Sequence, residues 1–458
     1  MRVLLACHAV PGHLNPNMAL ARNLVERGHE TAIYTGSLGR GVVESQGYRY
    51  FPFNPGFDQR IEPIMLPSGG VSNMATVATR RAWAFRLTEL NQTLSDWLIN
   101  SIPDQVEDLI EIARQYRPDV LVTDSTLLGP ILVLRETWNV PVAVFSVLAG
   151  CTIPGPQAPP WGRGLPPPRT FRTRLLCSVS DFLVSRLTQG FRARANEIRK
   201  QYGLPALEGR VAEQYARVPL FMVASTPSFD YDRTDLPSCV KYVGACSWDS
   251  GKQEKSPNWM KQLNGSRKVV HVTEGTLHTA RPLVLRAAAQ GLGDLPVDVV
   301  MTSGAHRKPE QLDLGPIAPN IRIEQFVPHS LLLPRTHVVI TTGGAGTVTK
   351  ALLAGVPLIV VPTAWELPEN AQRVVESGAG IRINPRRCTP ARIRGAVERI
   401  LGDPSYARNA RRVGQDLRQQ GGPARAVDLL EELLTAEPGA ISQKVGLKNQ
   451  SKNMEDIR

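Results

Sequence analysis

The most constraining feature of the sequence is an alternation of short apolar runs with helix-type segments, which occurs twice along the chain. The first series of apolar runs comprises Arg2–Ala6, Thr31–Tyr34, Asp119–Asp124, Val140–Ser146 and Pro219–Ala224. The second series starts at Val269 and reads VVHVTEG, VDVVMTSG, IRIEQFVP, HVVITTGG and VPLIVVP. Apolar strands that alternate with helices form parallel sheets with helices on both faces. The sequence therefore predicts an α/β fold in two halves.

The chain of 458 residues is too long for one compact core, so at least two domains are expected. We place an N-terminal domain at 1–230, a linker at 231–265 and a C-terminal domain at 266–404. Helices at 405–436 would close the fold, and the polar, lysine-rich residues 437–458 would be disordered. Proline and glycine crowd residues 153–169, which predicts a long loop, and residues 54–72 resemble them.

The first strand leads into a loop at Cys7–Leu14, which contains His13. We expect the next helix to begin with Asn15 as its N-cap and Pro16 in the first helical position, and to end at Gly28. His13 would then lie at the carboxyl edge of the first sheet, where open α/β sheets bind ligands. Asp124 ends a later strand at the same edge.

Charge and cysteine usage limit the classes of function. The formal charge of +12 comes mainly from scattered arginine, which fits a basic surface, an anionic substrate or the surface of an anionic membrane. Basic residues interleaved with aromatics are lacking, which disfavours nucleic acid. Six cysteines without a CxxC pair argue against a disulfide framework or a zinc site. Neither a cleavage-like signal site nor an apolar run of membrane-spanning length occurs, so a cytoplasmic location is expected.

A glycine-rich turn follows one strand of the second series, in the sequence TTGGAGTVTKALLAGVP (341–357). The third glycine of a dinucleotide fingerprint is missing, and so is the GxxxxGK[ST] pattern of a triphosphate loop. A strand, a glycine turn and a helix N-terminus suit a diphosphate, because unpaired amides and the positive helix end face it. A purely structural turn remains open on this evidence alone.

Three further motifs sharpen this interpretation: PGHLNP (11–16), QFVPHSLL (325–332) and PTAWELPENAQRV (362–374). Together with the glycine turn, in this order and spacing, they make the chain similar to the family 1 glycosyltransferases, especially bacterial enzymes that glycosylate natural products and lipids. The resemblance implies the GT-B fold, in which two Rossmann-like domains face each other across a cleft. The acceptor would bind the N-terminal domain and a nucleotide-sugar the C-terminal one, with the final helices crossing back. It also implies inverting transfer without a metal or other cofactor.

The resemblance also assigns roles to residues. His13 corresponds to the general base, and Asp124 to the carboxylate that supports it. Phe326 would stack on the nucleotide base, and the Glu366-Leu367 pair would read the sugar hydroxyls. The full set expected to bind the donor is Gly12, Gly275, Thr276, Phe326, Val327, His329, Thr342, Gly343, Gly344, Gly346, Thr347, Glu366, Leu367 and Asn370.

Five residues depart from the family pattern. Thr342 replaces a histidine at the start of the glycine turn, and Lys350 replaces a glutamate on the following helix. Glu366-Leu367 replaces an Asp-Gln pair, so an amide is lost, which favours a deoxygenated hexose or a relaxed sugar preference. His329 replaces a glutamine, which leaves UDP-sugars and dTDP-sugars as alternatives.

The chemistry agrees with the resemblance. Inverting transfer needs a base for the acceptor hydroxyl, and an imidazole oriented by a carboxylate suits neutral pH. The alternative is a catalytically weak homologue that acts as an auxiliary subunit; a dinucleotide-dependent oxidoreductase lacks its fingerprint. We expect a hydrophobic small-molecule or lipid acceptor, with core packing as the other interpretation of the candidate lining residues Phe57, Met65, Trp83, Phe85 and Trp161. Peripheral membrane contact and a monomer or homodimer are expected.

Overall fold

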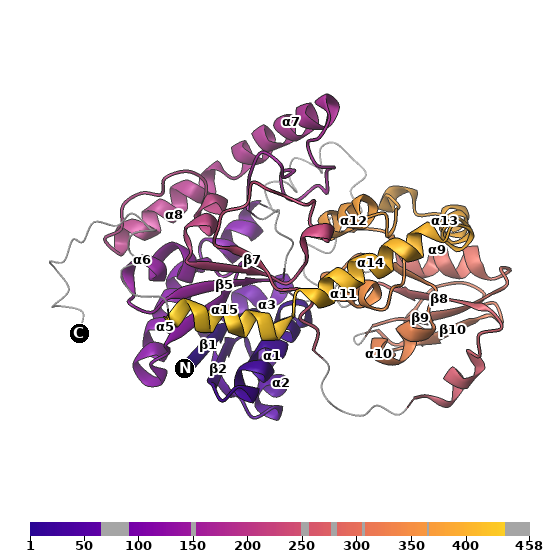
Figure 1. Cartoon of the computed structure of the whole chain (residues 1–458), viewed down its shortest axis with the longest axis horizontal. Helices are drawn as coiled ribbons and strands as arrows, with labels where there is room; N and C mark the ends of the chain where they lie inside the picture. The colour runs from indigo at the N-terminus through magenta and orange to yellow at the C-terminus, as the bar shows by residue number, and fades with distance from the viewer. Residues whose placement is uncertain are drawn as a thin grey trace.

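The computed structural model describes residues 1–65, 91–147, 153–248, 256–275, 282–304, 307–363 and 366–435. The predictions for Thr276, Trp83, Phe85 and the tail at 437–458 lie outside these residues, as does the side chain of Met65. Figure 1 shows two lobes, each built around a sheet, with the last helices running from one lobe to the other.

The N-terminal lobe contains a seven-stranded sheet in the order β3-β2-β1-β4-β5-β6-β7, and every neighbouring pair is parallel. Its strands are β1 (Arg2–Ala6), β2 (Glu30–Thr35), β3 (Arg49–Pro52), β4 (Val120–Asp124), β5 (Val142–Ser146), β6 (Leu220–Val223) and β7 (Val240–Tyr242). The central strands are buried along their whole length, as the apolar runs predicted.

The C-terminal lobe contains a second parallel sheet, with the order β10-β9-β8-β11-β12-β13. Its strands are β8 (Lys268–Thr273), β9 (Val297–Thr302), β10 (Ile321–Glu324), β11 (Val338–Thr341), β12 (Leu358–Val360) and β13 (Gly380–Arg382). The α/β fold with two parallel sheets is therefore confirmed. β7 lies inside the range predicted as linker, so the N-terminal lobe extends at least to Tyr242.

Helices cover both sheets (Figure 1). Those of the N-terminal lobe are α1 (Pro11–Glu26), α2 (Arg40–Ser45), α3 (Pro55–Met65), α5 (Ile102–Tyr116), α6 (Arg135–Thr137), α7 (Phe171–Leu187) and α8 (Gln189–Gln201). Those that follow are α9 (Leu283–Leu292), α10 (His329–Leu332), α11 (Ala345–Leu353), α12 (Leu367–Glu376), α13 (Pro390–Gly402), α14 (Ser405–Gln419) and α15 (Pro423–Thr435).

The predicted start of the first helix was wrong. α1 begins at Pro11, not Pro16, with Val10 as its N-cap, and the amides of His13 and Leu14 both donate to the Val10 carbonyl, at 3.0 and 2.8 Å. Both prolines suit a first helical position, but Pro16 lies inside the helix and forgoes one backbone hydrogen bond there. His13 therefore lies in the first turn of a helix, where its position is fixed more tightly than in a loop.

Two loop predictions had different outcomes. The segment predicted at 54–72 starts with helix α3, and Phe57 is fully buried against Phe53 at a ring-centroid distance of 4.6 Å. Phe57 is therefore a core residue, not a contact for an acceptor. The proline-rich residues 153–169 form neither helix nor strand, as predicted.

The last helix returns to the first lobe. Ala426, Val427 and Leu430 of α15 are fully buried in the same cluster as Leu20 and Leu24 of α1. A salt bridge from Arg27 to Asp428, at 2.6 Å, supports the contact. Within the described ranges, no helix has both the length and the apolar character needed to cross a membrane.

Candidate active site

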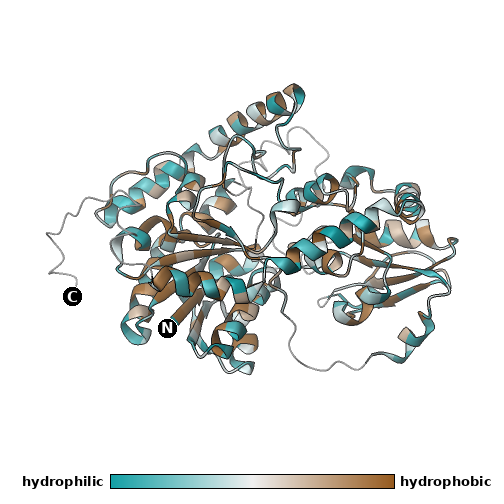
Figure 2. Ribbon diagram, viewed as in Figure 1, coloured by the Kyte–Doolittle hydropathy of each residue, from teal (hydrophilic) through white to brown (hydrophobic). Residues whose placement is uncertain are grey.

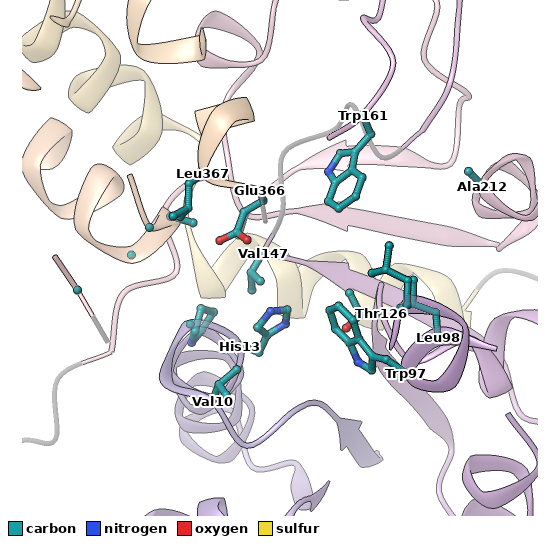
Figure 3. A pocket seen from close by; sticks show the side chains of 18 of the residues that line it. Val10, His13, Trp97, Leu98, Thr126, Val147, Trp161, Ala212, Glu366 and Leu367 are labelled. Atoms are coloured by element: carbon teal, nitrogen blue, oxygen red, sulfur yellow. The ribbon is translucent and has the colours of Figure 1, made fainter. Parts of the chain in front are cut away.

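A cavity of about 1780 Å³ lies between the two lobes, at the carboxyl ends of both parallel sheets. Its N-terminal wall includes His13, Trp97 and Trp161, and its C-terminal wall includes Phe326, Glu366 and the turn after β11. Figure 3 shows His13 below Glu366 and Leu367, with Trp97 and Trp161 to one side. The cavity therefore brings together most of the residues that the sequence singled out.

His13 and Asp124 form a hydrogen-bonded pair at the wall of this cavity. Nδ1 of His13 lies 2.5 Å from Oδ2 of Asp124. The His13 side chain is 15% exposed and that of Asp124 is fully buried, so the ring lies between carboxylate and cavity. Because Nδ1 is engaged by Asp124, Nε2 is the nitrogen left for a substrate. This is the arrangement expected of an oriented general base.

The two groups shift each other's pKa. Burial works to lower the pKa of His13, but the charge and hydrogen bond of Asp124 outweigh burial, so the pKa is raised above its usual value. Burial works to raise the pKa of Asp124, yet the charge of His13 and hydrogen bonds from His13 and Thr126 lower it to about 2. The carboxylate thus stays ionised and strengthens the imidazole as a base.

A second histidine, His8, supports this wall, and the sequence analysis missed it. His8 is 1% exposed, accepts a hydrogen bond from Nε1 of Trp97 at 3.1 Å, and packs edge-to-face against His13 with ring centroids 5.9 Å apart. Burial lowers the pKa of His8 to about 3, so its ring is neutral. Its position in the loop after β1, shortly before His13, was the available signal.

The glycine turn after β11 faces the cavity with a helix N-terminus. No side chain caps α11, and its first backbone hydrogen bond runs from Val348 to Gly344 at 3.0 Å. The amides of the three residues before Val348, which end with Thr347, therefore have no hydrogen-bond acceptor within the helix. A Cβ on Gly344 or Gly346 would meet no atom within 4 Å, so the cavity side of this turn is open.

Other members of the predicted set have supporting positions. Gly343 has φ of +102°, and a Cβ there would lie 2.6 Å from Val360, so the turn itself requires this glycine. Asn370 donates through Nδ2 to the Gly343 carbonyl at 2.9 Å and does not line the cavity. The Thr342 hydroxyl donates to the Glu274 carbonyl at 3.0 Å, so its hydrogen is directed away from a phosphate. Asn370 and Thr342 thus hold the turn in shape.

Glu366 and Leu367 lie at the start of α12. Burial raises the pKa of Glu366, while the charge of His13 works against the shift, which places the two groups within electrostatic reach. Figure 3 shows the carboxylate pointing into the cavity above His13. Leu367 also lines the cavity and leaves an apolar wall there.

Phe326, Val327 and His329 lie on the C-terminal wall. Phe326 is 65% exposed, which suits stacking. The ring of His271 bonds through Nδ1 to the Val300 carbonyl, so this nitrogen is the donor and its Nε2 accepts from Nε2 of His329 at 3.4 Å. His329 is then left with Nδ1 as an acceptor. Burial lowers the pKa of His329 to about 3, so the ring stays neutral.

Gly12, Gly275 and Lys350 also line the cavity. Gly12 lies in the first turn of α1, and Gly275 has φ of +71° after β8. Lys350, on the second turn of α11, is close enough for its charge to lower the pKa of His329. Across the described part of the chain, no group of three or more His, Cys, Asp or Glu side chains is arranged to hold a metal ion.

A contact between the proline-rich loop and α12 was not evident from the sequence. Glu369 is 1% exposed and accepts hydrogen bonds from the amides of Gly162 and Gly164 at 2.9 and 2.6 Å. Gly164 has φ of +55°, and a Cβ there would collide with the Pro368 carbonyl. Trp161 of the same loop lines the cavity. The wall on the N-terminal side is therefore attached to the helix that begins with Glu366 and Leu367.

Comparison with known proteins agrees with this geometry. Residues 287–433 match the family model of the C-terminal domain of erythromycin biosynthesis protein CIII-like proteins. The chain is 34% identical to 4'-demethylrebeccamycin synthase of Lentzea aerocolonigenes over 435 residues, which cover 94% of this chain and 99% of the relative. The chain belongs to the family 1 glycosyltransferases of bacterial natural-product type.

Solved structures place the glycosyltransferase in the GT-B fold. A calicheamicin glycosyltransferase superposes with a TM-score of 0.68 at 25% identity, covering 95% of this chain and 99% of that one. A spinosyn rhamnosyltransferase, solved with thymidine diphosphate, gives a TM-score of 0.64 at 22% identity over 94% of this chain and all (100%) of that one. The predicted family, fold and class of enzyme are therefore confirmed, and the glycosyltransferase acts on natural-product acceptors.

The first prediction concerns the partner of the base. Asp124→Asn removes the charge that raises the pKa of His13, so the pKa should fall. A base must be neutral, so the acid limb of kcat/KM against pH should move to lower pH, while the maximal rate falls by about tenfold or more. Rates measured at intervals of about one pH unit, from about pH 5 to about pH 9, would show both effects.

Asp108→Asn is the matched control, because Asp108 also accepts a hydrogen bond from a buried side chain, the Tyr34 hydroxyl at 2.7 Å, but lies outside the cavity wall. The acid limb of its profile of kcat/KM against pH should not move. An unmoved limb in Asp124→Asn would show that Asp124 does not tune the base.

The second prediction concerns Glu369. In Glu369→Gln the two loop amides lose a charged acceptor, so the loop that carries Trp161 should be held less firmly. The KM for the acceptor should rise by about tenfold, which is the value of one charged hydrogen bond, with little change in the KM for the donor.

Glu376→Gln, on the same helix, is the control. It removes a more exposed ion pair with Arg169 of 3.2 Å, which should contribute little. Equal rises in both KM values for Glu369→Gln would indicate general loss of structure in place of a specific role in holding the loop.

Proposed function

We propose that this enzyme transfers a hexose from a UDP- or dTDP-sugar to a hydroxyl group of a hydrophobic small molecule or lipid, with inversion and without a metal ion. One observation carries the proposal. His13, bonded to the buried Asp124 behind it, and the open N-terminus of α11 line one cavity, from opposite lobes. A base for an alcohol and a positive site for a leaving anion are what such a transfer requires.

The reaction follows from this placement. Nε2 of His13 takes the proton of the acceptor hydroxyl as its oxygen attacks the anomeric carbon of the sugar. The bond from that carbon to the diphosphate oxygen breaks on the opposite face, so the configuration inverts. Asp124 keeps the ring oriented and stabilises the imidazolium that forms. The proton, the sugar and the nucleoside diphosphate are then all accounted for.

The leaving diphosphate gains negative charge as the bond breaks. The amides before Val348 and the helix dipole of α11 provide positive potential in a fixed geometry. Lys350 on the next turn adds a full charge at the cavity wall. These groups supply the stabilisation that a divalent cation would otherwise give, which supports metal-independent transfer.

The sugar site favours a donor with fewer hydroxyl groups. Glu366 offers a carboxylate, but Leu367 offers only an apolar surface where an amide would bond a hydroxyl. A polar group facing Leu367 would lose its hydrogen bonds to water without replacement. A deoxyhexose, of the kind named for the rhamnosyltransferase structure, fits this surface.

The alternative of a non-catalytic subunit is less favoured. Burying Asp124 at the cavity wall costs free energy, which only the hydrogen bonds and charge of its partners offset. A binding scaffold gains nothing from this arrangement, whereas a base requires it.

The third prediction tests the base. His13→Ala should lower kcat by about a hundredfold or more, because proton removal is lost, while the affinity for UDP or dTDP stays within about twofold. Initial rates by product chromatography and calorimetric titration of the nucleotide would measure the two effects. NMR of the product should show an anomeric configuration opposite to that of the donor.

His29→Ala is the control, because His29 is a partly buried histidine bound to Glu431 at 2.8 Å, outside the cavity wall. It should keep normal activity. A product that retains the donor configuration would refute the mechanism, and so would full activity of His13→Ala.

The fourth prediction tests the sugar preference. Leu367→Gln restores an amide, so the ratio of kcat/KM for a fully hydroxylated hexose to that for its 6-deoxy counterpart should rise by about tenfold, as one hydrogen bond allows. Val375→Gln, at an exposed position of the same helix, should leave the ratio unchanged. An unchanged ratio in Leu367→Gln would remove the argument for a deoxygenated donor.

A further inference from the structure

Helix α7 exposes an unusual amount of apolar surface. Of the twelve large hydrophobic side chains that are exposed in the described residues, seven lie on α7: Phe171, Leu175, Leu176, Val179, Phe182, Leu183 and Leu187. Their exposed fractions run from 44% to 80%. We call these seven residues the α7 stripe. Figure 2 shows brown segments along this helix, although it projects from the lobe.

The burial pattern of α7 is the reverse of that in an ordinary surface helix, which buries its large apolar side chains. Its two buried residues are Cys177 and Ser180, which are small, whereas the large apolar side chains point outward. Positions 175, 179, 183 and 187 follow one another at intervals of four, which places them along one face. Packing within the described chain therefore does not explain why these side chains are apolar.

Arginines flank the stripe. Arg172, Arg174 and Arg186 of α7 are exposed, and the helix has one acidic residue, Asp181, which pairs with Arg210 at 2.7 Å. The three arginines have no ion pair with any residue that the structure describes. An apolar face with arginines at both ends is typical of helices that lie in the interface of an anionic membrane. The overall charge of +12 acts in the same direction.

The other face of α7 borders the cavity. The lining residues of α7 include Arg174 and Arg186, at the margins of this face, together with Cys177, Ser178, Asp181, Val184 and Ser185, and Phe182 belongs to both the lining and the stripe. The helix thus separates the cavity from the outer surface at this side of the N-terminal lobe. In Figure 1 it lies at the rim of the lobe, away from the sheet.

We propose that α7 docks this glycosyltransferase on the surface of an anionic lipid bilayer. The stripe would enter the boundary between head groups and acyl chains, and the arginines would bind lipid phosphates. Self-association is the weaker alternative, because two copies paired through this helix bring like-charged arginines together without acidic partners. A protruding helix also fits a soft bilayer surface without a preformed groove.

The docking would bring one wall of the cavity close to the lipid. If the acceptor is hydrophobic, which rests on the proposed function, it could pass from the bilayer along α7 into the site. The docking itself does not depend on that function, so the two are tested by separate measurements.

The experiment is flotation of the full chain with two kinds of vesicle, one of phosphatidylcholine alone and one that also contains about 30 mol% phosphatidylglycerol. The second provides an anionic lipid surface. Binding to the anionic vesicles and its loss at high salt are expected. Leu175→Gln/Val179→Gln/Leu183→Gln should weaken the partition coefficient by about a hundredfold. Arg172→Glu should weaken it by about fivefold or more.

Val25→Gln/Ile317→Gln, at exposed apolar positions outside α7, is the matched control and should bind like the unchanged chain. Transfer to a water-soluble acceptor, measured without vesicles, should be the same for the stripe variant and the control, which separates docking from catalysis. Failure of the unchanged chain to float would overturn the proposal. A dimer in sedimentation velocity that the stripe variant abolishes would also overturn it, in favour of self-association.

Discussion

The buried ion pair between Arg373 and Asp230 determines how the two halves of the active site meet. Nε and Nη2 of Arg373 bond one oxygen of Asp230 at 2.7 and 2.5 Å, and both side chains are fully buried. The guanidinium also lies 4.2 Å from the centre of the Tyr231 ring. Tyr231 and Asp232 have φ of +66° and +51°, conformations that cost free energy outside glycine. Such a pair adds little net stability, but it permits one geometry.

That geometry explains why catalysis can use groups from two lobes. Arg373 and Glu369 lie on α12, which begins at Glu366 and Leu367. Glu369 holds the loop of the N-terminal wall through two amides. Asp230 follows strand β6. This strand belongs to the N-terminal sheet, and His13 and Asp124 lie at the carboxyl ends of two other strands of that sheet. A displacement of α12 would therefore move Glu366 and the loop together and would change the distance between Glu366 and His13. Effective catalysis tolerates little such error.

The sequence predicted the strands with buried apolar runs and missed three others, for a physical reason. β3, β7 and β13 are all edge strands, three or four residues long, and they include arginine or lysine. Edge strands need charge and brevity to avoid further pairing, so they lack the pattern that identifies a central strand. The start of α1 was missed because two prolines both satisfied the rule for a first helical position.

Some features of the candidate site could also be predicted from the sequence, and others could not. His13 and Asp124 could be predicted to meet, because His13 follows one strand, Asp124 ends another, and the carboxyl ends of parallel strands lie on the same side of a sheet. The roles of Thr342, Asn370 and Glu369 could not, because they depend on which way a side chain turns. His8 and Trp97 meet across 89 positions of sequence, which no local pattern encodes. In the C-terminal wall, the start of α11 presents main-chain amides to the cavity, and the side chains of Glu366 and Leu367 line it beside them. On the proposed mechanism, substitutions of Glu366 and Leu367 change the sugar preference while the chemistry persists, because the main-chain amides of α11 do not depend on these side chains.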